Sequence, residues 1–172
     1  SRGVALPEDG AGDLTVASLA ARKNELFGRR RSADGAEVVA GNVAFARRLA
    51  AAGVRTAVVS SSANARAVLE RAGIVDLFDP IVDGVVAAAE DLAGKPAPDM
   101  FLRAAELTGV PPAEAAVVED AGAGVAAGVA GRFGLVIGIG VGDHAAELAA
   151  AGATVVVADL AGATIEGAPA AP

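Results

Sequence analysis

Short apolar runs alternate with segments of helical character along most of the chain, and each run is followed by a turn or a polar cluster. Five such runs, apolar apart from the Thr that opens two of them, are residues 56–59, 80–82, 115–118, 135–137 and 154–157. Strands that are apolar at every position are covered on both faces, as in parallel sheets, whereas a strand with one wet face alternates. The pattern therefore predicts an α/β fold built on an open, doubly wound parallel sheet.

Five helices are expected before and between these strands, because glycine or proline stands where several of them would begin or end. Gly53 and Gly73 would end the first two, since glycine adopts positive φ without strain. The expected helices cover residues 37–52, 64–72, 98–108, the Ala- and Gly-rich segment after Asp120, and 143–151. Helices in these places make the strand-to-strand crossovers parallel and right-handed.

Three parts are expected along the sequence. Residues 1–36 open with a turn-rich stretch and continue into one helical segment from near Asp13, which is too short to form a domain alone. Residues 37–160 contain the alternating helices and strands and are expected to form the core. Residues 161–172 are expected to form a loose tail.

Composition and charge restrict the possible functions. The 172 residues are 53% apolar and contain no Cys, which indicates one packed core without disulfides or thiolate metal ligands. The net charge of −7 argues against a nucleic-acid partner. Residues 1–55 are nevertheless basic, and we interpret Arg29–Arg31 and Arg47–Arg48 as solvated helix faces. With no bilayer-length apolar run and no signal pattern, we expect no membrane partner and a cytoplasmic location.

Polar residues gather at or near the carboxyl ends of the predicted strands. Ser60–Ser62 follows the first strand, Glu119 and Asp120 follow the strand 115–118, and Lys95 stands in a loop before a helix. Each has a structural explanation, since serines cap helices, a Lys-Pro loop is ordinary surface, and acids complement a helix dipole. Ligands on open parallel sheets bind at the carboxyl ends of strands, so the three together favour a functional site.

The chemistry of these groups suits phosphoryl transfer. A Ser hydroxyl and a Lys ammonium can hold a phosphate, and the reaction depends mainly on positioning and charge stabilisation. Two adjacent carboxylates repel each other unless a hard cation lies near them, and Mg²⁺ prefers oxygen ligands. Glu119 and Asp120 are therefore the predicted Mg²⁺ site.

The segment Gly122–Gly128 offers a rival interpretation, because it follows a strand, opens a helix and resembles a dinucleotide-binding fingerprint with one extra spacer. Such a fingerprint places a pyrophosphate at the helix N-terminus. Glu119 and Asp120 would repel it there. We therefore interpret these glycines as allowing a tight turn and close packing of helix on sheet.

The single histidine, His144, directly follows Asp143 at the start of an expected helix. We interpret Asp143 as the N-cap of that helix. His144 is then an exposed residue of the first turn rather than a functional group.

Three of the polar segments resemble motifs of the haloacid dehalogenase superfamily, in particular of its β-phosphoglucomutase-like branch. Residues 58–64, 94–101 and 118–125 resemble its second, third and fourth motifs, and Arg22–Asn24 resembles the motif of its cap domain. The resemblance implies that residues 37–160 form the α/β core of that family and that residues 1–36 are the carboxyl-terminal part of a helical cap.

The resemblance also implies the roles of particular residues. Ser60 and Lys95 would be catalytic groups that hold the transferring phosphate, and Glu119 and Asp120 would bind Mg²⁺. The implied substrate-binding residues are Lys23, Asn24, Ser61, Ser62 and Asn64. The implied substrate is a phosphorylated sugar or a similar small phosphate ester.

The sequence departs from the family pattern in one respect, because it contains no Asp-x-Asp. That first motif supplies the nucleophile and the general acid/base, and it lies on a central strand between those matching 56–59 and 115–118. Without that strand, both neighbours would present unpaired apolar edges. We therefore expect the chain to be a fragment that begins inside the cap, with the missing amino-terminal segment of the same protein as a partner, unless something else fills the gap.

Two functions stay open at this point. The first is Mg²⁺-dependent phosphoryl transfer on a phosphosugar, by a mutase or a phosphatase, with the nucleophile supplied from outside this sequence. The alternative is a non-catalytic homologue that binds a phosphorylated ligand or a protein without turnover.

Overall fold

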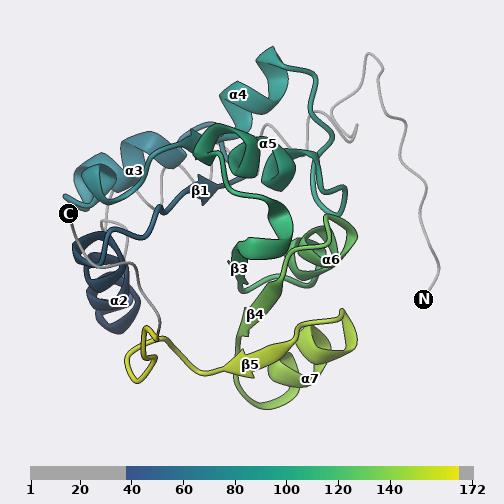
Figure 1. Cartoon of the computed structure of the whole chain (residues 1–172). Helices are drawn as coiled ribbons and strands as arrows, with labels where there is room; N and C mark the ends of the chain where they lie inside the picture. The colour runs from purple at the N-terminus through teal and green to yellow at the C-terminus, as the bar shows by residue number, and fades with distance from the viewer. Residues whose placement is uncertain (1–37, 167–172) are drawn as a thin grey trace, which may run out of the picture. The chain divides into compact units, whose positions relative to one another are not determined.

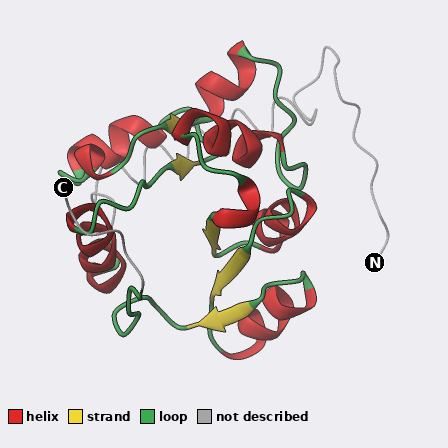
Figure 2. Cartoon of the chain, viewed as in Figure 1, coloured by secondary structure: helices red, strands yellow, loops and turns green. Residues whose placement is uncertain are grey.

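A computed structural model of the chain describes residues 38–166. In chain order the elements are α2 (Ala40–Ala51), β1 (Val58–Val59), α3 (Ala65–Arg71), β2 (Ile81–Val82), α4 (Gly84–Ala89), α5 (Asp99–Thr108), β3 (Ala116–Glu119), α6 (Gly122–Ala130), β4 (Leu135–Ile139), α7 (Gly142–Ala150) and β5 (Val155–Val157) (Figures 1 and 2). Two short 3₁₀ helices, Val75–Leu77 and Pro112–Glu114, precede β2 and β3. Within the described residues, no helix has the length and apolar character needed to cross a membrane. The predicted cap segment, with Lys23 and Asn24, lies outside the described residues.

The strands form two parallel sheets, which confirms the predicted α/β class. One sheet pairs β1 with β2, and the other has the order β3–β4–β5. All five expected strands and all five expected helices of residues 37–160 are present. Within residues 38–166, β1 and β3 are not hydrogen-bonded to each other, and no further strand joins the two sheets. This interruption falls where the family resemblance implies an additional central strand, and that strand stays a prediction.

Helix α4 was not expected from the sequence. Its residues include glycine and two valines, which have low helix propensity. The helix forms because Asp83 caps it, with Oδ1 accepting hydrogen bonds from the amides of Val85 at 3.0 Å and Val86 at 3.1 Å. Asp83 is only 6% exposed, so a single buried side chain at the end of β2 overrides the local propensity.

One hydrophobic core cluster lies on one face of the sheet β3–β4–β5, beneath α6 and α7. A second, with Val82, Met100 and Ala104, lies at β2 and α5. Val117, Val125, Val136 and Leu148 are all buried in the first cluster. The all-apolar runs predicted burial on both faces, but the next residue along β3, Val118, is 44% exposed. Among the described residues, the prediction of double coverage is therefore wrong for β3, because α6 and α7 both pack on the face that carries Val117.

Gly128 brings α6 close to the sheet, as the sequence suggested for its glycines. A Cβ at Gly128 would lie 3.2 Å from Val136 Cγ2 and 3.3 Å from the side chain of Val117. These separations are tighter than ordinary van der Waals contact. The helix can approach β3 and β4 this closely because glycine has no side chain.

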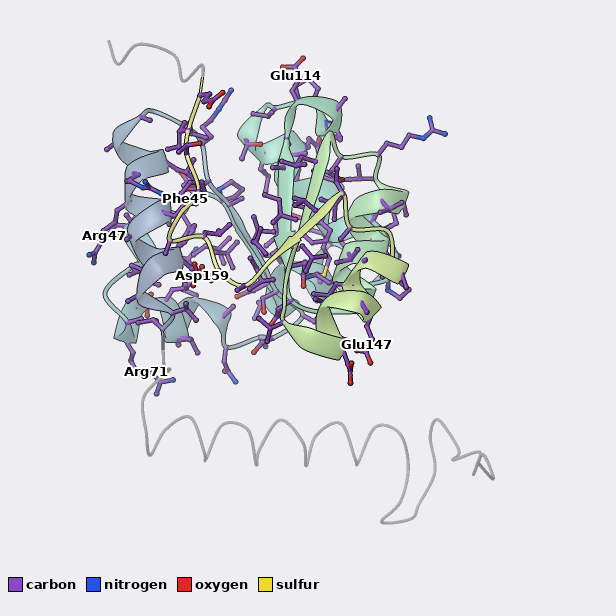
Figure 3. The ribbon with its side chains drawn as sticks, turned by 90° about the horizontal axis from the view of Figure 1, so that it is seen from below. Phe45, Arg47, Arg71, Glu114, Glu147 and Asp159 are labelled. Atoms are coloured by element: carbon purple, nitrogen blue, oxygen red, sulfur yellow. The ribbon has the colours of Figure 1, made fainter. Side chains whose placement is uncertain are left out.

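The segment after β5 packs against α2. This packing includes Ala163, which falls in the expected loose tail of residues 161–172. The amide of Leu160 donates to Asn42 Oδ1 at 2.9 Å, and Arg48 donates to the carbonyl oxygen of Ala163 at 2.6 Å. Leu160 is buried. Arg47, one residue before Arg48, is exposed and points away from α2 (Figure 3), as expected of a solvated helix face.

Candidate active site

Lys95 stands in the loop between α4 and α5 and is held on three sides. Its Nζ donates to the carbonyl oxygen of Val59 on β1 at 3.2 Å and contacts Glu119 Oε1 at the end of β3. The ring of Phe101 lies below the ammonium, 4.7 Å from its centroid. The Lys95 side chain is only 14% exposed and that of Glu119 only 10%. The α4–α5 loop and the ends of β1 and β3 therefore meet at one largely buried ion pair.

The Glu119 carboxylate lies over the first turn of α6. A Cβ at Gly124 would fall well inside 3.0 Å of this carboxylate, a separation that real Cβ atoms essentially never show. The other carboxylate oxygen, Oε2, accepts from the amide of Ala121 at 3.4 Å. With a side chain at position 124, the Glu119 carboxylate would have to move from the place where it contacts Lys95.

The serines after β1 form a compact loop. The amide of Ser60 donates to the carbonyl oxygen of Val82 at 3.0 Å, which extends the pairing of β1 with β2. Ser60 Oγ accepts from the amide of Ser62, and Ser62 Oγ accepts from the amide of Asn64, both at 3.2 Å. Both hydroxyl oxygens thus order the loop that precedes α3, and both hydroxyl hydrogens stay available to a ligand.

Gly84, the first residue of α4, supports this loop. Its amide donates to the carbonyl oxygen of Ser62 at 3.3 Å, and a Cβ at Gly84 would lie 2.8 Å from the carbonyl oxygen of Ser61. Asn64 stands at the N-cap of α3 but makes no side-chain capping hydrogen bond. The helix-capping explanation of this loop therefore does not account for the side chain of Asn64.

Asp120 is exposed, and its main chain is held from α7. His144 Nε2 lies 2.7 Å from the carbonyl oxygen of Asp120, and His144 Nδ1 lies 3.3 Å from Glu147 Oε2. The hydrogen bond to the Asp120 carbonyl and the Glu147 carboxylate raise the pKa of His144 above its ordinary value. The sequence predicted Asp143 as the N-cap of α7, but the N-cap is Val141. His144 lies in the first turn and is exposed, as predicted, but it also contacts the predicted metal site.

The acidic pair fits a magnesium ion as part of a larger ligand set. Mg²⁺ is usually bound through one or two carboxylates together with waters and substrate oxygens. The Asp120 carboxylate is exposed, whereas the Glu119 carboxylate is engaged by Lys95. In residues 38–166, no group of three or more His, Cys, Asp or Glu side chains is placed to hold a metal. Of these two carboxylates, that of Asp120 is therefore the one exposed to a cation from solvent, with Glu119 beside it in the chain.

The structure brings some of the predicted residues together. Lys95 and Glu119 are in contact, and through Val59 they lie at the strand end that leads into Ser60. The contacts of His144 with Asp120 and of Phe101 with Lys95 were not predicted. Phe101 is also buried in the hydrophobic core. The contact of His144 with Asp120 joins residues 24 positions apart in the chain, so no local pattern indicates it.

A family model described as haloacid dehalogenase-like hydrolase matches residues 5–132 of this chain. The β-phosphoglucomutases of Mycobacterium bovis and Mycobacterium tuberculosis are each 50% identical to it over 158 residues. The match covers 90% of this chain and 60% of each relative. The chain thus spans only part of the length of these relatives.

Solved structures resemble the fold over most of the chain. The β-phosphoglucomutase of Clostridium difficile superposes with a TM-score of 0.71 at 25% identity, covering 87% of this chain and 63% of that one. A haloacid dehalogenase family hydrolase of Deinococcus radiodurans, crystallised with bound phosphate and sodium, is 33% identical with a TM-score of 0.61. That match covers 69% of this chain and 54% of the other.

Proposed function

Because the chain belongs to the haloacid dehalogenase-like hydrolase family, we propose that the protein transfers a phosphoryl group on a phosphorylated sugar, as a β-phosphoglucomutase-like mutase or as a sugar phosphatase. The relatives named β-phosphoglucomutase support this substrate class. The contact of Lys95 with Glu119 and Val59 carries the proposal, because it sets a cation and a carboxylate beside the strand end that leads into Ser60.

Lys95 and Ser60 are proposed to hold the phosphoryl group during transfer. Negative charge spreads over its equatorial oxygens, so catalysis depends on fixed positive charge and on hydrogen-bond donors. The contacts with Val59, Glu119 and Phe101 hold the Lys95 ammonium in place. Ser60 can donate its hydroxyl hydrogen to a phosphate oxygen while its Oγ still accepts from the amide of Ser62.

The nucleophile is proposed to come from an Asp-x-Asp strand outside these 172 residues, because the sequence contains no such motif. The first aspartate would form a bond to phosphorus while the bond from phosphorus to the sugar oxygen breaks, and the second would give that oxygen a proton. The strand is proposed to lie between β1 and β3, which do not pair in the described part of the chain. Its carboxyl end would then reach the Lys95–Glu119 pair.

Asp120 is proposed to hold Mg²⁺, with Glu119 as its neighbour at the site. When bound, the ion would offset the charge of the phosphoryl oxygens and of the attacking carboxylate. Glu119 would keep Lys95 directed toward the phosphate, since their contact is largely buried. The aspartate strand would supply the further oxygen ligands.

Substrate contacts are proposed for Ser61, Ser62 and Asn64 in the loop after β1, and for Lys23 and Asn24 in the cap segment, which lies outside the described residues. A cap that closes over the substrate excludes water. Transfer back to the sugar then outcompetes hydrolysis, so the degree of closure separates a mutase from a phosphatase.

The proposal can be tested by joining the chain to an amino-terminal segment that carries an Asp-x-Asp strand. The joined protein and the chain alone are assayed on a panel of hexose and pentose phosphates, with Mg²⁺ or with excess chelator. Phosphorus NMR separates phosphate release from migration of the phosphate on the sugar. We expect Mg²⁺-dependent turnover only in the joined protein.

The matched control replaces both aspartates of the added strand with asparagine, which preserves shape and removes the nucleophile. Lys95→Met in the joined protein should also abolish turnover. If the joined protein is folded and binds sugar phosphates but turns none of them over, the enzyme proposal is wrong.

A second candidate function is binding without turnover, because the nucleophile is absent from the sequence while Lys95 and the serine loop keep the groups that grip an anion. Titration calorimetry with inorganic phosphate and a sugar phosphate tests it. Binding by both forms of the protein with turnover by neither would favour this second function.

A further inference from the structure

The peptide group between Asp120 and Ala121 is held at both ends. Its carbonyl oxygen lies 2.7 Å from His144 Nε2, and its N–H donates to Glu119 Oε2 at 3.4 Å. A carbonyl oxygen can only accept, so Nε2 carries the hydrogen in this contact whatever the charge of the ring. One peptide plane is therefore fixed between an imidazole from α7 and a carboxylate from β3.

His144 reaches this peptide because of the local geometry that opens α7. Gly142 has φ of +57°, a left-handed conformation that side chains rarely adopt, and it turns the chain from β4 into the helix. A Cβ at Gly140 would lie 2.9 Å from His144 Cδ2. The imidazole ring of His144 thus packs closely against the main chain of Gly140, which has no side chain.

The peptide belongs to a continuous series of polar contacts. The series begins at His144 on α7 and passes through the Asp120–Ala121 peptide to the Glu119 carboxylate. It continues to the Lys95 ammonium and ends at the carbonyl oxygen of Val59 on β1. Hydrogen bonds in such a series polarise one another. Fixing the peptide plane sets ψ of Asp120, and with it the path of the main chain next to the Asp120 carboxylate.

We propose that His144 is a positioning residue, which holds the Asp120–Ala121 peptide so that its N–H meets Glu119 and the Asp120 carboxylate is presented to a divalent cation. This inference rests on the metal site of the proposed function. His144 itself touches neither cation nor substrate. Removing its hydrogen bond should loosen the β3–α6 turn and leave the rest of the fold unchanged.

Three variants of the full chain separate this role from a general effect on folding. His144→Ala removes the donor, and His144→Gln restores an N–H near the position of Nε2. Glu147→Ala removes only the contact to Nδ1 and serves as the control. His144 and Glu147 are 47% and 76% exposed, and Glu147 points outward from α7 (Figure 3), so all three variants should fold. Circular dichroism verifies this.

The first readout is hydrogen exchange of the Ala121 amide by NMR, which needs no metal. Loss of one hydrogen bond should speed this exchange about fivefold in His144→Ala, with little change in His144→Gln or Glu147→Ala. The second readout is the affinity for Mn²⁺, used as a probe of the Mg²⁺ site. Loss of a partner that orients a ligand typically weakens metal affinity about tenfold, again only in His144→Ala.

The outcomes are distinguishable. The positioning role is wrong if the Ala121 amide exchanges as slowly in His144→Ala as in the wild-type chain. It is also wrong if His144→Gln speeds this exchange as much as His144→Ala does. Asp120→Asn reports on the metal site itself. If the wild-type chain binds no Mn²⁺, or if Asp120→Asn binds it equally well, the proposed metal site is wrong, while Ala121 exchange still decides the role of His144.

Discussion

The Lys95 ammonium and the Glu119 carboxylate are in contact although 24 residues separate them in the chain. The same ammonium donates to the carbonyl oxygen of Val59. β1 and β3 do not pair with each other in residues 38–166, so this contact joins two strand ends that no shared ladder connects. The Lys95 side chain thus links the ends of β1 and β3 and is also the candidate catalytic cation.

Removing either member of this pair should destabilise the fold. A largely buried charge that loses its partner typically costs about 3 kcal/mol. We expect a loss of this order for Glu119→Gln and for Lys95→Met, which keeps the packing against Phe101. Urea denaturation of both single variants and the double variant gives the coupling energy. Because the double variant leaves no unpaired charge, its loss should be clearly smaller than the sum of the two, and additive losses would contradict the pairing.

Gly124→Ala tests whether the first turn of α6 must accommodate the Glu119 carboxylate. Alanine favours a helix by about 1 kcal/mol over glycine, whereas overpacking costs about 1–3 kcal/mol. Displacing Glu119 would also break its contact with Lys95, so we expect a net loss of stability. Gly162→Ala is the control, because nothing lies within 4 Å of a Cβ at that position. A more stable Gly124→Ala would show that Glu119 moves away at little cost.

The sequence predicts the framework well because burial pattern and turn chemistry act locally. All five strands were found, and Gly53, Gly73 and Gly109 each have positive φ just after a helix. Helix α4 was missed because its stability depends on one capping aspartate and not on its own residues. Exposure of Val118 was missed because coverage of a strand depends on which elements surround it in space.

The candidate site was predicted in part for the same reason. Residue types at strand ends indicate which side chains lie near one edge of a sheet, and Lys95 and Glu119 do meet there. The contact of His144 with Asp120 joins α7 to the end of β3, and no spacing in the sequence indicates it. Gly140, which makes room for the ring, is one of 22 glycines, so composition does not single it out.

Asp83→Ala should unfold α4 locally and destabilise the protein. Loss of an N-cap side chain costs about 1–2 kcal/mol, and Asp83 is the cap for both Val85 and Val86. Asp83→Asn, whose side-chain oxygen can still accept, should retain most of the stability. Urea denaturation measures both. Exchange of the Val85 and Val86 amides should rise only in the alanine variant, and equal losses in both variants would mean that the carboxylate charge matters more than the cap.

The pKa of His144 should lie above its ordinary value of about 6.5, first because its ring donates to the Asp120 carbonyl oxygen and second because the Glu147 carboxylate is near. Since His144 is the only histidine, one imidazole proton resonance followed by NMR against pH measures it directly. A raised folded-state pKa adds stability that is present below the unfolded value and is lost as the pH rises through the folded value. Glu147→Gln should lower the pKa and shrink this loss, and an unchanged pKa in that variant would contradict the contact.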